Sequence, residues 1–350
     1  CTKRCPENLV PLLLFRVAVE KLQEIGHPIE PVHDFALLLR DLQIKEEDVF
    51  WCKGDGLDEH TETILFPGCD SVRAPHEIQT HIDILNGFGF SFKTLWDEDL
   101  CCGFRGYSIN DFKEGDRLLN NFIFILKKLG VKKVILSCGQ CFNQLKRIEF
   151  DKYGLDIEII YFPQLIVNLI SKYKFPQHIN RKITFHDSCK TARGVRDFDS
   201  VRNILGMIPG ITIREMEKTR ENSLCCGGVK NFSYPEVTRG LLRERLTQAV
   251  KTGSDMLVTD CTFCYSMYSI LEDQFQLEVK HYSSLISEAM GLKSRPDNYK
   301  QILKDLNSNK PLKILYKKVL KEEEKNEYMQ QIDLFADLIR KLRALPDAAD

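Results

Sequence analysis

Two copies of one cysteine pattern constrain this chain more than any other feature of its sequence. In each copy a lone cysteine is followed by an adjacent Cys-Cys-Gly and then by a Cys-x-x-Cys, with gaps of 31, 35 and 2 residues in the first copy and 35, 34 and 2 in the second. Ten of the 13 cysteines fall into this pattern. Thiolates gathered in fives have few uses besides holding metal. The first set is Cys69, Cys101, Cys102, Cys138 and Cys141, and the second set is Cys189, Cys225, Cys226, Cys261 and Cys264.

The offset between the two sets indicates an internal duplication. The lone cysteines lie 120 residues apart, the Cys-Cys pairs 124 and the Cys-x-x-Cys pairs 123. Short β-rich runs precede the lone cysteines and the Cys-x-x-Cys pairs, and helical patterns lie between them. This alternation predicts an α/β fold with a mostly parallel sheet in each half and cysteines at the carboxyl ends of strands. The expected strands are 63–66, 133–137, 183–185 and 255–259, and the expected helices include 116–129 and 237–251.

The composition is that of an ordinary globular protein, with a hydrophobic share of 43%, a charged share of 28% and a formal net charge of -1. No basic patch interleaved with aromatic residues indicates nucleic acid binding. The apolar run from Leu9 to Val19 is interrupted and shorter than the roughly 20 residues of a bilayer span, so we do not expect this chain itself to cross a membrane. The Cys-Cys and Cys-x-x-Cys elements fit a disulfide scaffold poorly. We therefore expect the protein in the cytoplasm, either free or bound at the cytoplasmic face of a membrane complex.

A smaller motif occupies the first six residues. Cys1-Thr2-Lys3-Arg4-Cys5-Pro6 matches the closing C-x3-C-P of the ferredoxin run C-x2-C-x2-C-x3-C-P. The match predicts that Cys1 and Cys5 bind an additional cubane [4Fe-4S] cluster whose other ligands lie upstream. The alternative is a surface turn with two unrelated cysteines.

The two Cys-Cys pairs are the most specific indication of metal binding in this sequence. Each pair supplies two thiolates from one turn, and the glycines that follow, Gly103 and Gly227-Gly228, would let the backbone come close to a bulky inorganic core. A four-iron cubane needs four cysteines, so the fifth either bridges two irons or is not a ligand. Zinc held by four thiolates of one set is the alternative. A vicinal disulfide is disfavoured by its strain, and Cys52, which has no repeat partner, is interpreted as a simple thiol.

The twin pattern resembles the CCG-motif proteins of the heterodisulfide reductase family: the B-type subunit, and the D-type subunit in which a ferredoxin module precedes the B-type part. The resemblance covers about residues 60–285. It implies two Rossmann-like halves related by a pseudo-twofold axis. It also implies that each set of five cysteines binds a noncubane [4Fe-4S] cluster, so that all ten are cofactor-binding and metal-binding residues.

The family also contains iron–sulfur subunits of glycolate, glycerol-3-phosphate, lactate and succinate oxidising systems, many of which lose one cysteine of the final pair. Both Cys-x-x-Cys pairs are complete here, which favours the disulfide-reducing branch. Among the polar residues near the motifs, His186, Lys190 and Arg105 are the candidates for a proton donor and a cationic clamp in a thiolate-forming reaction. The alternative role for the cations is charge compensation beside anionic clusters.

Five segments are expected along the chain. The C-terminal segment contains a Lys/Glu-rich run at 317–325, which is interpreted as a solvated helix face. A helical pattern follows, and its apolar stripe either faces the core or docks a partner. The stripe consists of Leu334, Phe335, Leu338, Ile339 and Leu342. The segments are 1–6, the tail of a ferredoxin-like [4Fe-4S] module; 7–60, a helical linker or packing segment; 61–180, the first CCG domain; 181–290, the second CCG domain; and 291–350, a C-terminal helical extension.

These features predict an iron–sulfur catalytic subunit of a heterodisulfide-reductase-like complex, an oxidoreductase that reduces or reversibly forms a disulfide of thiol cofactors or a protein thiol. The expected partners are ferredoxin-like, flavin-containing or membrane cytochrome b type electron-transfer subunits, together with the disulfide substrate or thiol protein. One alternative is an electron-transfer subunit between a flavin dehydrogenase and a quinone-linked membrane partner. A zinc-stabilised scaffold is the other.

Overall fold

The computed structural model describes residues 61–69, 71, 74–96, 100–108, 111–228, 235–307 and 336–344. The predicted ferredoxin-like tail with Cys1 and Cys5, the segment 7–60 with Cys52, and the Lys/Glu-rich run lie outside the described residues. No helix in the described part of the chain has both the length and the apolar character that a membrane span requires.

Four parallel strands form the sheet of the first half, in the order β2-β1-β3-β4. The central strands β1 and β3 pair so that Phe66 lies opposite Leu136, each the last residue of its strand. Their bounds are Thr63–Phe66 for β1, Lys93–Thr94 for β2, Lys133–Leu136 for β3 and Glu158–Tyr161 for β4.

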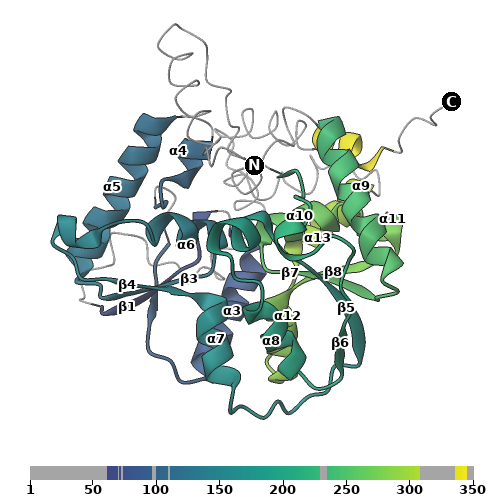
Figure 1. The fold of residues 1–350 in the computed structure, drawn as a ribbon, viewed down its shortest axis with the longest axis horizontal. Helices are drawn as coiled ribbons and strands as arrows, with labels where there is room; N and C mark the ends of the chain where they lie inside the picture. The colour runs from purple at the N-terminus through teal and green to yellow at the C-terminus, as the bar shows by residue number, and fades with distance from the viewer. Residues whose placement is uncertain are drawn as a thin grey trace, which may run out of the picture.

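The second half repeats this sheet, with the parallel order β6-β5-β7-β8. The prediction of an α/β protein with two halves, each carrying one CCG motif, is confirmed (Figure 1). The strands expected before the lone cysteines and the Cys-x-x-Cys pairs are β1, β3, β5 and β7. The bounds of the second set are Arg181–His186 for β5, Ile211–Ile213 for β6, Met256–Thr259 for β7 and Glu278–His281 for β8.

Helices follow the strands in both halves, and the two predicted helices correspond to α5 and α9. Local sequence explains where α5 begins: the side chain of Asp111 accepts a hydrogen bond of 3.0 Å from the backbone N–H of Glu114, which caps the first turn. The helices of the first half are α3 (Pro75–Gly87), α4 (Phe104–Ser108), α5 (Phe112–Leu129), α6 (Gly139–Leu145), η5 (Phe150–Tyr153) and α7 (Phe162–Ile170). Those that follow are η6 (Lys190–Val195), α8 (Ser200–Met207), η7 (Arg220–Asn222), α9 (Pro235–Lys251), α10 (Thr262–Ser269), α11 (Glu272–Phe275), α12 (Tyr282–Ala289), α13 (Asn298–Asn307) and a helix at 336–343.

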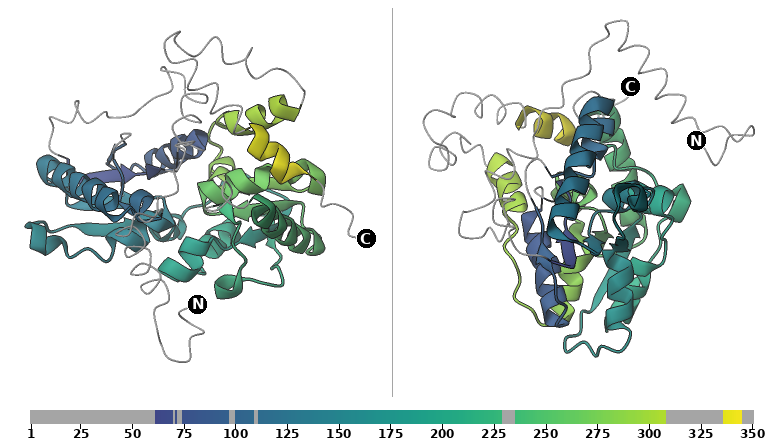
Figure 2. Two further views of the ribbon diagram at one scale, coloured as in Figure 1. Left: turned by 90° about the horizontal axis from the view of Figure 1, so that it is seen from above. Right: turned by 90° about the vertical axis from the view of Figure 1, so that its left-hand side faces the viewer.

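The two halves pack through equivalent helices. Helix α3 contacts α12, and α7 contacts α8. Since α3 and α8 follow the first strands of their halves and α7 and α12 follow the last, exchanging the halves exchanges these two contacts. The four helices lie in the middle of the molecule, between the two sheets, and the halves lie side by side (Figures 1 and 2). The joint is apolar and buried, with Ile84, Phe162, Ile204 and Ile286 all in one cluster.

Each half also has its own apolar core around its cysteines. The helix at 336–343 packs into the core of the second half, where Leu338, Ile339 and Leu342 are buried. These three members of the predicted stripe therefore face the core, as one of the two interpretations expected. Leu334 and Phe335 lie outside the described residues.

A buried carboxylate links the halves within the apolar joint. Glu77 of α3 accepts hydrogen bonds from the hydroxyls of Ser283 and Ser284, the latter at 2.6 Å, at the start of α12. His281 Nδ1 lies 3.3 Å and His76 Nε2 3.2 Å from its oxygens. Burial alone would raise the pKa of Glu77, but the charge and hydrogen bonds of the two histidines outweigh burial and hold the pKa well below its usual value.

Replacing Glu77 by glutamine should therefore destabilise the protein. The amide keeps the volume but loses the charge that four neighbours satisfy, and a hydrogen bond to a charged group contributes about 1.5–3 kcal/mol to stability. Because the pKa of folded Glu77 is depressed, its contribution is complete above the unfolded pKa of about 4.3 and declines as the pH falls through the folded value. Denaturant unfolding at pH 7 and in steps below pH 4.5 measures both effects.

Asp83 of α3 provides the matched control, because it makes a partly exposed ion pair with Arg295. Asp83→Asn should cost about 0–1 kcal/mol. A Glu77→Gln variant as stable as Asp83→Asn would show that the buried carboxylate does not hold the halves together.

Candidate metal centres

Both cysteine sets lie where the chain order of each sheet reverses. Cys69 follows β1 and Cys138 follows β3, the two adjacent strands from which the chain runs to opposite edges. Cys189 and Cys261 hold the same positions after β5 and β7. The crevice outside the carboxyl ends of such strands is where open α/β sheets bind ligands. The thiols are therefore at the binding edge of each sheet.

The five thiols of the first set form one continuous chain of contacts. The Sγ atoms of Cys69 and Cys101 are 3.7 Å apart. Cys101 also interacts with Cys102, Cys102 with Cys141, and Cys141 with Cys138. The side chains that the sequence predicted to act together are thus brought together.

The second set repeats this chain of contacts in the same order. Cys189 interacts with Cys225, and Cys225 with Cys226. The Sγ atoms of Cys226 and Cys264 are 3.5 Å apart, and Cys264 interacts with Cys261. All ten thiols are free, so neither Cys-Cys pair is a disulfide.

The first cysteine of each Cys-x-x-Cys occupies the position directly before a helix. Cys138 precedes α6 with φ -87° and ψ 120°, and Cys261 precedes α10 with φ -130° and ψ 121°. The second cysteine of each pair lies within the helix and is buried, as Cys141 and Cys264 are, whereas Cys138 and Cys261 are partly exposed. Each centre therefore has a buried side and a side open to solvent.

The glycine of each Cys-Cys-Gly has a positive φ, 86° at Gly103 and 74° at Gly227, which disfavours other residues. A Cβ on Gly103 would lie 2.6 Å from the carbonyl oxygen of Gly115, and one on Gly227 would lie 3.1 Å from Thr238 Cα. The glycines thus bring the Cys-Cys turn close to α5 and α9. The space beside the thiols is tight at Gly68, where a Cβ would lie 3.2 Å from Cys141 Sγ.

One thiol in each set is strongly acidic. Hydrogen bonds from Cys102 and Cys69 lower the pKa of Cys101 to about 3, with help from backbone N–H groups. Hydrogen bonds from Cys189 and Cys226 lower the pKa of Cys225 to about 2, and the N–H of Gly227 donates to its sulfur at 3.3 Å.

The buried thiols behave oppositely. Interaction with the neighbouring ionised thiol raises the pKa values of Cys102 and Cys226 well above their usual range. Metal coordination deprotonates such thiols, so filling either set would release protons.

The predicted catalytic candidates occupy three different environments, and their roles stay predictions. His186 is fully buried: its Nδ1 accepts from Arg245 Nε at 3.1 Å, and burial, then Arg245, lowers its pKa well below the usual value. Lys190 Nζ lies 4.0 Å from the ring centroid of Phe104, so it bridges the two halves by a cation–π contact. The backbone of Arg105 helps to lower the pKa of Cys101.

A charged network behind the second set was not predicted from the sequence. The guanidinium of Arg202 holds Asp187 by two hydrogen bonds of 2.6 and 2.9 Å and also pairs with Glu215. Asp187 accepts further bonds from the backbone N–H of Arg220 and the hydroxyl of Thr219. The network fixes the loop that leads to Cys225. The partners of Asp187 lie 15 or more residues away in the chain, so no local sequence pattern indicates this network.

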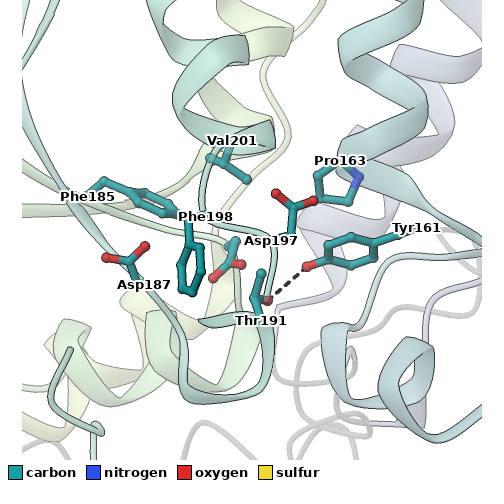
Figure 3. Close-up of a pocket in the computed structure, with 9 residues that line it drawn as sticks. Tyr161, Pro163, Phe185, Asp187, Thr191, Asp197, Phe198 and Val201 are labelled. Atoms are coloured by element: carbon teal, nitrogen blue, oxygen red, sulfur yellow. Dashed lines mark hydrogen bonds between the residues drawn. The ribbon is translucent and has the colours of Figure 1, made fainter. Parts of the chain in front are cut away.

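A small pocket lies at the border of the halves, beside the second set (Figure 3). Tyr161 of the first half and Thr191 of the second share a hydrogen bond of 2.9 Å on its wall. Asp260, directly before Cys261, also lines it and is buried, and burial raises its pKa. The pocket has room for about one water molecule. It therefore has space for water but not for a substrate.

The donor set fits an iron–sulfur cluster by its chemistry. Five soft thiols in mutual contact suit iron–sulfur clusters and zinc. Within the described ranges, no three or more His, Cys, Asp or Glu side chains are arranged to hold a single metal ion. The residues that would hold a cluster are the five cysteines of each set.

Fold and site together define a twin α/β protein with one five-thiol centre in each half. The profile of the CCG cysteine-rich domain matches residues 63–146 and 183–269. The chain thus belongs to the proteins that carry two copies of this domain, and the predicted resemblance to the heterodisulfide reductase family is confirmed.

Three curated relatives illustrate the similarity. The D-type subunit of a CoB–CoM heterodisulfide reductase from Methanosarcina mazei is 29% identical over 68% of this chain and 61% of the relative. Its counterpart from Methanosarcina barkeri is 32% identical over 67% of this chain and 61% of the relative. An EtfAB:quinone oxidoreductase of Syntrophomonas wolfei is 28% identical over 59% of this chain and 30% of the relative. The chain spans about three fifths of the length of the two reductase relatives.

The two centres should lose metal independently. Cys102→Ala should empty the first set and leave the second filled, and Cys226→Ala should do the reverse, because each set is assembled within its own half. The emptied half should also become sensitive to protease, since metal binding contributes folding energy. Metal content per chain and limited proteolysis measure the two effects.

Cys52→Ala is the matched control and should retain all metal, because Cys52 has no counterpart in the repeat. Equal loss of metal from both halves in either single variant would indicate one shared site instead.

Proposed function

We propose that this chain is the iron–sulfur catalytic subunit of a heterodisulfide-reductase-like complex, with one [4Fe-4S] cluster of noncubane type in each set of five cysteines. The observation that carries the proposal is the repeated chain of five thiol contacts, complete in both halves. Similarity to the two Methanosarcina reductases supports the assignment to heterodisulfide reduction.

The position of the centres supports a shared substrate. Helix α6, which carries Cys141, packs against η6, which begins directly after Cys189. At this contact a Cβ on Gly139 would lie 2.6 Å from Thr191 Oγ1, so the contact leaves no room for a side chain at position 139. Because Cys138 directly precedes α6 and Cys189 directly precedes η6, both centres adjoin this border, and a disulfide bound where both can reach it could react with both.

Cleavage of a disulfide takes two electrons and two protons and yields two thiols. Bound clusters would supply the electrons one at a time, one from each centre. The chain itself would hold the clusters through its cysteines and orient an anionic thiol substrate through Lys190. The cation–π contact with Phe104 places the ammonium of Lys190 between the halves.

An electron relay is the second candidate function. The similarity to an EtfAB:quinone oxidoreductase favours it, because the name of that relative describes electron transfer to a quinone rather than disulfide chemistry. In that case the chain would pass electrons between a flavin dehydrogenase and a quinone-linked membrane partner. Zinc in one set remains a further alternative for the cofactor.

Several sequence predictions enter this proposal unchanged. They are a cubane cluster at Cys1 and Cys5, CCG domains at 61–180 and 181–290, a cytoplasmic location, and ferredoxin-like, flavin-containing or cytochrome b type partner subunits.

A thiol should change the electron paramagnetic resonance (EPR) spectrum of the oxidised protein if substrate sulfur binds at the clusters. We would titrate anaerobic, iron-loaded protein with small thiol cofactors and with a protein bearing a flexible C-terminal cysteine. The S-methyl thioether of each small thiol is the control, because it has nearly the same shape and cannot provide a thiolate. The proposal predicts a new signal with thiols and none with thioethers.

Disulfide reduction with an artificial one-electron reductant completes this test. Turnover of a disulfide together with the thiol-induced signal supports the reductase. The relay would be supported instead if no thiol changed the EPR spectrum and a flavin dehydrogenase reduced the protein.

A further inference from the structure

The buried faces of the two halves can be compared position by position. Residues of α5 that face the core, Gly115, Leu119, Ile123 and Leu126, correspond at an offset of 123 to buried Thr238, Leu242, Leu246 and Ala249 of α9. The same offset relates Phe122 to Arg245. The last residues of β1 and β5 correspond at an offset of 120, which relates Phe66 to His186.

Beneath the first set, these positions are apolar. Phe66 and Phe122 are both 0% exposed, and their ring centroids are 4.7 Å apart. Leu145, seven residues after Cys138, is equally buried and belongs to the same apolar cluster as Phe66 and Phe122. Cys101, Cys102 and Cys141 belong to the same apolar cluster. A charge on the first centre would therefore face an apolar floor.

Beneath the second set, the equivalent positions are polar and include a cation. Arg245 is 0% exposed and donates to His186 Nδ1, Ser223 Oγ and Gln248 Oε1, each at 3.1 Å, and to the carbonyl of Lys218. Tyr268, at the position of Leu145, places its hydroxyl 3.3 Å from His186 Nδ1.

The guanidinium of Arg245 makes no ion pair with a carboxylate in the described part of the chain; its hydrogen-bond acceptors are all neutral groups. The carboxylates that influence it from farther away, Asp187 and Glu215, are bound by Arg202. A buried cation without a counter-charge is costly. The hydrogen bond from Arg245 to Ser223 Oγ, two residues before Cys225, places the guanidinium against the segment that carries the Cys-Cys pair of the second set.

We propose that Arg245 makes the metal centre of the second set the more easily reduced of the two. This inference rests on the proposed iron–sulfur clusters. Reduction adds a negative charge to a cluster, and a fixed positive charge nearby, in a poorly screened interior, stabilises the reduced form. The first centre has a phenylalanine at the same position and gains no such stabilisation. An electron shared by the pair therefore resides on the second centre.

Redox titration of iron-loaded protein, followed by EPR, tests the inference. The Cys102→Ala background reports the second centre alone, and the Cys226→Ala background reports the first. In otherwise wild-type protein the second centre should have the more positive midpoint potential. Arg245→Met, which keeps the length of the side chain, should shift the second centre to a more negative potential and leave the first unchanged.

Two further variants separate charge from packing. Arg245→Lys should retain the higher potential of the second centre, because it keeps the charge. Phe122→Leu, at the equivalent position of the first half, should leave the order of the two potentials unchanged.

Iron and sulfide are measured in every variant, so that the two claims can fail separately. Clusters in both sets with equal potentials, or with the second centre lower, would overturn the role of Arg245 and leave the proposed function standing. Absence of iron from both sets would overturn the proposed function and this inference with it. The comparison of the two backgrounds decides the order of the potentials even if Arg245→Met does not fold.

Discussion

The convergence of five thiols at the carboxyl edge of a parallel sheet is the constraint that shapes each half of the molecule. Strand ends and the helix starts that follow them lie directly at this edge. Cys69 and Cys138 come from the two strands at which the chain order reverses. The Cys101-Cys102 turn reaches the same point because Gly103, with φ 86°, lets it lie against α5. The fold thus serves to bring these three segments together.

Duplication of this unit gives a second centre, and the way the halves pack gives the centres a common border. Equivalent helices form the joint, and buried Glu77 makes a polar link across it. The cores beneath the two centres have diverged, with Phe122 in one and Arg245 in the other. With the proposed iron–sulfur clusters in place, this difference would give the two centres different reduction potentials.

Much of this arrangement could be predicted from the sequence, because the cysteine spacing and the β-rich runs are local signals. These signals predicted the strands at 63–66 and 255–259. They also predicted that Cys69 and Cys101 belong to one set. The burial of Arg245 could not be predicted from the sequence, because an arginine in a helix is usually exposed. The structure shows that Arg245 is buried, at the position equivalent to Phe122. The strands β2 and β6 could not be predicted, because they are too short to show an alternation of apolar and polar residues. The apolar stripe left two interpretations open, which the burial of Leu342 decided.

An iron–sulfur cluster in each set of five cysteines is the proposal on which the reductase, the relay and the role of Arg245 all rest. Metal and acid-labile sulfide analysis of anaerobically purified protein, with a low-temperature EPR spectrum, tests it most directly. We expect about four irons and a matching amount of sulfide for each filled set. Stoichiometric zinc with little sulfide, in colourless protein, would contradict it.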